Sequence, residues 1–171
     1  KPPRHTINAR TEEMASKPMW RGALRQARCL LPALGWYEWR AAERVDADTG
    51  EVERYKQSYF IRPPAGEIIC FAGIWSPRAG EGANASCAIL TRASVGALTQ
   101  VHDRMPVILA AADHDAWLDP RNQSVAALKQ LIKPCADTMM RAHAVSTRVN
   151  APKNEDAGLI EPLDEGGLDL K

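Results

Sequence analysis

Residues 29–33 and 35–39 read Cys-Leu-Leu-Pro-Ala and Gly-Trp-Tyr-Glu-Trp, and these stretches decide the predicted fold. Both are short and rich in apolar and aromatic residues, so they predict two extended segments around a glycine-containing turn. Similar runs recur along the chain between turn residues such as Pro63-Pro64-Ala65-Gly66. They predict five more strands, over residues 54–62, 68–76, 86–91, 105–109 and 142–148.

Helix signals stand between these strands. A proline near the first turn and good helix formers predict a helix over residues 19–27. Ser124 is the expected N-cap of a helix over residues 124–133, and two more helices are expected over residues 94–101 and 111–118. Because strands predominate without strict βαβ alternation, the predicted fold class is α+β. We expect a largely antiparallel sheet, curled toward a partly open barrel, with short flanking helices.

Length and composition agree with this fold class. The chain has 171 residues, of which 45% are hydrophobic and 25% charged, and these values exclude disordered and collagen-like classes. This length allows one proper core, so we predict a single domain over residues 1–171. The apolar runs are far shorter than the ~20 residues that cross a bilayer, which predicts no membrane partner.

Charge is unevenly distributed, although the net charge is only +1. Residues 1–44 hold nine Lys and Arg against four Asp and Glu, whereas residues 151–171 hold two against six. A basic N-terminal part and an acidic tail can orient a polyanion. An ordinary solvated surface explains the same distribution.

The four cysteines show no Cys-x-x-Cys spacing and indicate a reducing, cytoplasmic location. Cys29, Cys70 and Cys87 each stand in an apolar run, so we expect them to be buried; the fourth is Cys135. The histidines have no ligand spacing. We therefore expect no metal site. We also expect a monomer without another cofactor.

Glu38 stands between aromatic residues in Trp36-Tyr37-Glu38-Trp39. Burial disfavours the charged form of a carboxyl group and raises its pKa, which suits a group that transfers protons near neutral pH. The alternative is an edge-strand carboxylate that points to water or pairs with an arginine.

Three other residues are candidates for chemistry or binding. His102 lies at a predicted helix-to-strand junction, where rigid elements can hold a functional side chain. Its neighbour Asp103 is not expected to be its partner, because adjacent residues of an extended segment point to opposite faces. Asn8 and Arg10 share a face if residues 7–10 are extended, and Arg suits bidentate phosphate binding. A turn-forming asparagine is the alternative for Asn8.

Six blocks of sequence occur in one order along the chain. They are Ile7-Asn8-Ala9-Arg10, residues 28–33 together with residues 35–39, Phe71-Ala72-Gly73-Ile74-Trp75, Ala88-Ile89-Leu90-Thr91, His102-Asp103-Arg104-Met105-Pro106-Val107-Ile108-Leu109 and Val145-Ser146-Thr147-Arg148-Val149-Asn150. Together they resemble the SOS response-associated peptidase (SRAP) family over residues 7–162. The Tyr-Glu-Trp and His-Asp-Arg-Met-Pro blocks are the most specific.

The resemblance implies a sensor of abasic sites in single-stranded DNA that traps the ring-opened aldehyde covalently and associates with the nucleoid when bound to DNA. In the family, a cysteine after the initiator methionine supplies an α-amine for a Schiff base and a thiol that closes a thiazolidine. The same site removes that methionine. The match implies that Glu38 shuttles protons, Asn8 orients the amine and His102 acts as the acid that helps open the deoxyribose. It further implies phosphate contacts by Arg10 and Arg104, with Thr91 lining the site and Trp39 beside a base.

The chain departs from the family pattern at its start. The N-terminal block that carries the nucleophilic cysteine has no counterpart in the sequence, so we expect that segment to be missing. The loop over residues 41–53 is expected to be longer than usual. Two alternatives stay open: a non-catalytic single-stranded DNA-binding module, and a cysteine hydrolase that uses Cys29 with His102.

These expectations meet in one geometric prediction. Asn8, Glu38 and His102 should converge on one pocket, with Arg10 and Arg104 at its flanks because a polyanion held through its backbone needs spaced cations.

Overall fold

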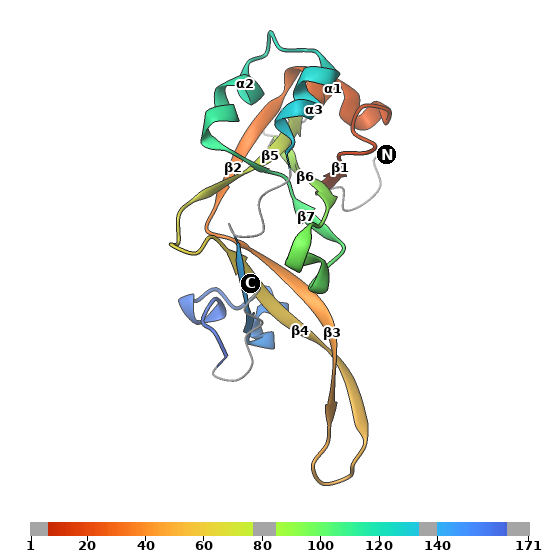
Figure 1. The fold of residues 1–171 in the computed structure, drawn as a ribbon, viewed down its shortest axis with the longest axis vertical. Helices are drawn as coiled ribbons and strands as arrows, with labels where there is room; N and C mark the ends of the chain where they lie inside the picture. The colour runs from red at the N-terminus through yellow and green to blue at the C-terminus, as the bar shows by residue number, and fades with distance from the viewer. Residues whose placement is uncertain (1–6, 77–84, 134–139, 164–171) are drawn as a thin grey trace. The chain divides into compact units, whose positions relative to one another are not determined.

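The computed structural model describes residues 7–76, 85–133 and 140–163, and its strands form two separate sheets (Figure 1). The predicted α+β class with largely antiparallel pairing is confirmed, and the described strands close no barrel. The chain divides into two compact units, each built from three segments. Residues 1–33, 68–93 and 104–135 belong to unit 1, and residues 34–67, 94–103 and 136–171 to unit 2.

Unit 1 contains the larger sheet. Its described strands are β1 (Asn8–Arg10), β2 (Arg28–Ala33), β5 (Ile69–Ser76), β6 (Ser86–Ala93), β7 (Arg104–Pro106) and β8 (Ile108–Leu109). They follow the order β1-β6-β5-β2, with β7 beside β6 and β8 beside β5. Among these pairs, β1 with β6 is parallel and the others are antiparallel.

Helices cover the sheet of unit 1 (Figure 1). They are α1 (Pro18–Gln26), α2 (His114–Leu118) and α3 (Val125–Leu131). Pro18 occupies the first turn of α1, and the Ser124 hydroxyl accepts a hydrogen bond from the N–H of Ala127, which confirms Ser124 as an N-cap. No helix in the described ranges is long and apolar enough to cross a membrane. The apolar core between sheet and helices includes Ala9, Met14, Leu24, Ile74, Leu90, Val107, Trp117 and Leu128.

Arg28 joins the ends of two of these helices. Its guanidinium donates hydrogen bonds to the backbone oxygens of Leu24 and Arg25, at 2.7 Å each, and to those of Trp117 and Asp119. These carbonyls lie at the C-terminal ends of α1 and α2, where helical acceptors lack partners within the helix. A cation at this position satisfies them and interacts favourably with both helix dipoles.

Unit 2 contains an antiparallel sheet in the order β3-β4-β9. Its strands are β3 (Trp36–Val45), β4 (Val52–Arg62) and β9 (Arg141–Val145). Because β9 pairs with residues 58–62, the outer parts of β3 and β4 form a two-stranded ribbon (Figure 1). The prediction of a loop over residues 41–53 is therefore wrong, because β3 and β4 include most of these residues. The ion pairs Arg44–Glu53 and Arg54–Glu43 link the two strands.

Gly35 allows β3 to start against β4. A Cβ atom at this position would overlap the carbonyl oxygen of Ile61 and the ring of Phe60. Glycine alone fits such a close approach of backbone and ring. The glycine-containing turn that the sequence predicts before Trp36 thus serves the packing of this hairpin.

The strand predicted over residues 105–109 is broken at Val107. Its N–H donates to the carbonyl oxygen of Leu90 on β6, and its own carbonyl accepts from the N–H of Ala72 on β5. Pro106 has no N–H with which to continue the first ladder. The segment therefore changes partner here, and β7 and β8 pair with different strands.

Three other predicted elements differ in length or type. The helix predicted over residues 94–101 is a 3-10 helix, η1 (Gly96–Gln100), and the one over residues 111–118 begins as η2 (Ala111–Asp113) before α2. The strand predicted over residues 142–148 ends at Val145. The Ser146 hydroxyl accepts from the N–H of Arg148 and so begins another 3-10 helix, η4 (Thr147–Asn150). A last short helix is η5 (Ala157–Leu159).

Candidate functional site

Glu38 and His102 lie close together in unit 2. Glu38 is on β3, and His102 follows η1, where its backbone N–H donates to the carbonyl oxygen of Leu98 at 3.1 Å. Nδ1 of His102 lies 3.8 Å from Oε2 of Glu38. The Glu38 side chain is only 18% exposed, although β3 is an edge strand. The alternative of a carboxylate pointing into open water is therefore wrong.

Burial raises the pKa of Glu38 above its usual range, as the sequence predicts. The negative charge of Asp103 adds to this increase, whereas His102 and a hydrogen bond with the Trp36 side chain oppose it. The indole N–H of Trp36 can only donate, and Trp36 lies two residues before Glu38 on the same face of β3. The carboxyl group is thus placed to exchange a proton closer to neutral pH than an exposed glutamate does.

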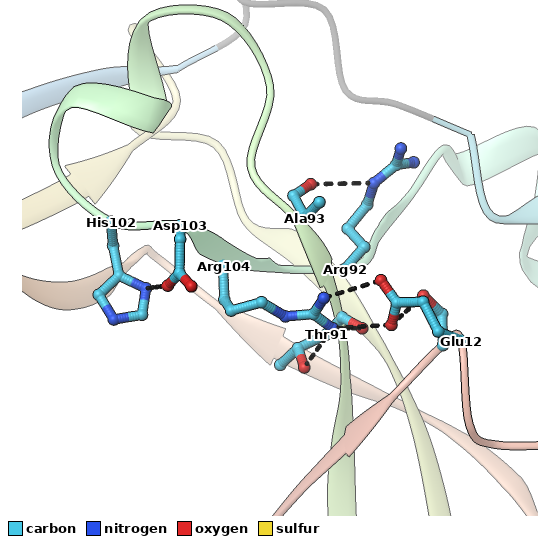
Figure 2. A network of polar contacts seen from close by, with 8 residues as sticks. Glu12, Thr91, Arg92, Ala93, His102, Asp103 and Arg104 are labelled. Carbon is cyan, nitrogen blue, oxygen red and sulfur yellow. Dashed lines mark hydrogen bonds and ion pairs between the residues drawn. The ribbon is translucent and has the colours of Figure 1, made fainter.

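Asp103 contacts His102, and the prediction that it would not is wrong. Oδ1 of Asp103 lies 3.2 Å from Nδ1 of His102 (Figure 2). The prediction assumed an extended segment, but Asp103 lies in a bend between η1 and β7, where side chains do not alternate between two faces. Nδ1 of His102 therefore faces two carboxylates, those of Asp103 and Glu38.

Trp39 follows Glu38 on β3 and points to the opposite face of the strand. Its indole N–H donates to Oδ1 of Asn150, in η4, at 2.7 Å. The residue is 37% exposed, so this hydrogen bond fixes the ring while part of its surface stays accessible.

In unit 1, four of the candidate residues share one face of the larger sheet. Asn8 and Arg10 are on β1, Thr91 is on β6 opposite Arg10, and Arg104 is on β7 opposite Ala93. Because side chains alternate along each strand, this register places all four on the same side. The residues between them, Ala9, Leu90 and Met105, are buried. The expectation that Asn8 and Arg10 lie in an extended segment is confirmed.

Arg104 is held by Thr91 and Glu12 (Figure 2). Its Nη2 donates to the carbonyl oxygen of Thr91 at 2.6 Å and to the Thr91 hydroxyl at 3.2 Å. Nη1 and Nη2 also donate to Oε1 and Oε2 of Glu12, at 2.8 and 3.1 Å. The bidentate hydrogen bonds from Arg104 hold the pKa of Glu12 at about 2.

The cysteines are less buried than the sequence predicts. Cys29 and Cys70 are partly buried and Cys87 is exposed, so the expectation is wrong for Cys87, while Cys135 lies outside the described residues. Burial raises the pKa of the Cys29 thiol, whereas a catalytic thiol needs a lowered pKa. Within the part of the chain that the structure describes, no three His, Cys, Asp or Glu side chains form a group that could hold a metal ion.

The candidate residues therefore occur in two groups, one in each unit. Glu38 and His102 are together in unit 2, and Asn8, Arg10, Thr91 and Arg104 are together in unit 1. One pocket shared by Asn8, Glu38 and His102 stays a prediction, because Asn8 belongs to the other unit.

Four contacting residues were missed in the sequence. They are Glu12, Trp36, Asp103 and Asn150. The two-residue spacing of Trp36 and Glu38 on a predicted strand could have indicated the contact between these two side chains. No local pattern connects Glu12 with Arg104, which lies 92 positions further along the chain.

Sequence comparisons connect the chain with proteins of one kind. A family model described as SOS response associated peptidase (SRAP) matches residues 1–152. The abasic site processing protein YoaM of Bacillus subtilis is 37% identical over 158 residues, which are 91% of this chain and 65% of YoaM. YedK of Escherichia coli, named in the same way, is 30% identical over 95% of this chain and 69% of its own length. The chain thus spans less than two thirds of YoaM.

Solved structures are similar as well. A protein from Bacteroides thetaiotaomicron matches with a TM-score of 0.75 and 25% identity, over 92% of this chain and 66% of that one. A phage-related protein from Bordetella bronchiseptica matches with a TM-score of 0.64 and 31% identity, over 83% of this chain and 64% of that one. The chain therefore shares its fold with solved structures from two bacteria.

Proposed function

The chain belongs to the SOS response-associated peptidase (SRAP) family, and on this basis we propose that it processes abasic sites in single-stranded DNA by linking them covalently to itself. The observation that carries this proposal is the pair of Glu38 and His102. A largely buried carboxyl group of raised pKa beside an imidazole suits repeated proton transfer.

The nucleophile in this proposal is an N-terminal cysteine, as in the family, in a segment before Lys1. Its neutral α-amine attacks the aldehyde carbon of the opened sugar, and a Schiff base forms with loss of water. The thiol then adds to the imine carbon and closes a thiazolidine, so that the net change is release of one water molecule. His102 helps to open the deoxyribose, and Asn8 orients the amine.

Glu38 moves the protons of this sequence. In its protonated form it gives a proton to the departing hydroxyl, and as a carboxylate it takes the thiol proton when the ring closes. The two transfers leave Glu38 unchanged. The same group serves removal of the initiator methionine and reversal of the adduct.

Arg10 and Arg104 bind the DNA backbone in this proposal. Both are on one face of the same sheet, and Thr91 lies between them on β6. Guanidinium groups suit phosphate oxygens, and such contacts carry no sequence information. Trp39 offers a partly exposed ring beside a base, since aromatic stacking tolerates any base.

The two alternatives fit the observations less well. The raised pKa of the Cys29 thiol disfavours a hydrolase that uses it as the nucleophile. A non-catalytic DNA-binding module would not need the burial of Glu38 beside His102, which disfavours the charged carboxylate.

The test uses the chain with its N-terminal segment restored, starting Met-Cys, and a single-stranded oligonucleotide that carries one abasic site. A denaturing gel should show a stable covalent band, which is absent with undamaged DNA and when the leading cysteine is replaced by serine. Residues 1–171 alone should give no stable band. A stable band from residues 1–171 that disappears in Cys29→Ala would contradict the mechanism and favour the hydrolase.

A second experiment tests the phosphate role. Arg10→Ala and Arg104→Ala should each weaken binding of single strands of any base sequence to the same degree, and wild-type binding should weaken as salt rises. An effect confined to one base sequence would contradict it.

A further inference from the structure

Glu12 occupies the edge of Arg104 that a phosphate group would use. The two terminal nitrogens of the guanidinium form a fork that matches the two oxygens of a carboxylate or a phosphate. In the structure both terminal nitrogens bond to Glu12, at 2.8 and 3.1 Å, and one of them also bonds to Thr91 (Figure 2). A phosphate can bind this edge only if the carboxylate leaves it.

We propose that the Glu12 carboxylate takes the place of a phosphate group on Arg104. In the free protein it occupies the two terminal nitrogens of the guanidinium, and the backbone of single-stranded DNA displaces it on binding. This inference rests on the proposed function, because it gives the strand a defined competitor at one of its contact points. It makes Glu12 a residue that sets the strength of DNA binding and its dependence on salt.

The two partners of this ion pair differ in how firmly they are held. The Arg104 side chain is 20% exposed and is bonded to the backbone and the hydroxyl of Thr91, on the neighbouring strand. The Glu12 side chain is 54% exposed and follows the short strand β1 in a turn. The carboxylate can therefore turn into water while the guanidinium stays in place, aligned by Thr91.

Protonation does not open this edge under ordinary conditions. The pKa of Glu12 lies at about 2, so the carboxylate is charged at every pH at which DNA binding is measured. Displacement must come from a stronger or multivalent anion. A strand that also contacts Arg10, on the same face, brings more than one phosphate and has this advantage over a single small anion.

The test compares two neighbouring glutamates. Glu12→Gln removes the competing charge but keeps the side chain's size, and Glu13→Gln is the matched control. Glu13→Gln changes the net charge by the same amount. Glu13, however, pairs with Lys17, at 2.5 Å, and not with Arg104. The full chain is titrated into a fluorescent, undamaged oligothymidine, and anisotropy is recorded over a series of salt concentrations.

We expect Glu12→Gln to bind about tenfold more tightly than wild type at low salt, with a dependence of log K on log salt that is steeper by roughly 0.7 for the newly available phosphate contact. Glu13→Gln should change both quantities much less. In an Arg104→Ala background, Glu12→Gln should have no more effect than Glu13→Gln. A gain of affinity cannot arise from misfolding, so the expected result is not open to that explanation.

Two results would overturn the inference. Equal effects of Glu12→Gln and Glu13→Gln would mean that only net charge matters, and weaker binding by Glu12→Gln would mean that Glu12 positions Arg104 for DNA instead of competing with it. If wild type binds and Arg10→Ala and Arg104→Ala weaken it, either result removes this inference and leaves the proposed function standing. If the wild-type protein does not bind the oligonucleotide at low salt, the result contradicts both this inference and the proposed function.

Discussion

Glu12 in unit 1 and Glu38 in unit 2 each lie beside a basic side chain, yet their pKa values move in opposite directions. Glu12 is more than half exposed and accepts two hydrogen bonds from Arg104, at 2.8 and 3.1 Å, which lower its pKa to about 2. Glu38 is largely buried, and His102 at 3.8 Å is beyond hydrogen-bond distance, so desolvation outweighs attraction. The Glu12 carboxylate therefore stays ionised near neutral pH, whereas Glu38 can take up a proton more readily.

The largest expected effect is on proton transfer by Glu38. In the N-terminally restored chain, Glu38→Gln should slow methionine removal and adduct reversal by about 100-fold or more, because an amide cannot exchange the proton. Gel-based time courses measure both rates. Glu43→Gln on the same strand, where Glu43 pairs with Arg54, is the control. Rates within threefold of wild type would show that Glu38 is no proton carrier, and circular dichroism checks that the variant is folded.

The second expected effect is on stability, where the two glutamates should have opposite signs. The pKa of Glu12 is lowered on folding, so its contribution is present above pH 4.5 and is lost as pH falls toward 2. The pKa of Glu38 is raised on folding, so its contribution is greatest at low pH and is lost as pH rises through the raised value.

Urea unfolding at a series of pH values measures this contrast. Glu12→Gln should lower the free energy of unfolding by about 1 kcal/mol at pH 7, a small amount because the pair is exposed to solvent, and the deficit should shrink toward pH 2. Glu38→Gln should gain stability relative to wild type as pH rises. Parallel pH profiles for the two variants would contradict the comparison.

The smallest expected effect concerns the hydrogen bond between Trp36 and Glu38. This bond favours the charged carboxylate, so Trp36→Phe should raise the pKa of Glu38 further and move the midpoint of the pH–rate profile of adduct formation upward. Trp75→Phe, in unit 1, removes an indole elsewhere and should leave the midpoint unchanged. A midpoint that moves downward in Trp36→Phe would contradict the role of the indole.

The sequence was sufficient where local pattern decides the structure. Aromatic residues around Glu38 predict a strand and burial, and the strand and the raised pKa are confirmed. The ion pair of Glu12 with Arg104 could not be predicted from the sequence. The two residues are brought together by the parallel pairing of β1 with β6 and the antiparallel pairing of β6 with β7. The contact of Asp103 with His102 was missed because a bend replaces the expected extended segment.

The ribbon of β3 and β4 also bears on how such a chain can change over evolution. Every residue of β3 from Trp36 to Val45 has a partner on β4, so the hairpin grows or shrinks by whole cross-strand pairs. Such a change at the tip, beyond Arg40 and Gln57, leaves Glu38 opposite Tyr59 and on the same face. Insertions and deletions in multiples of two are therefore the length variants that the hairpin can inherit without disturbing the residues at its base.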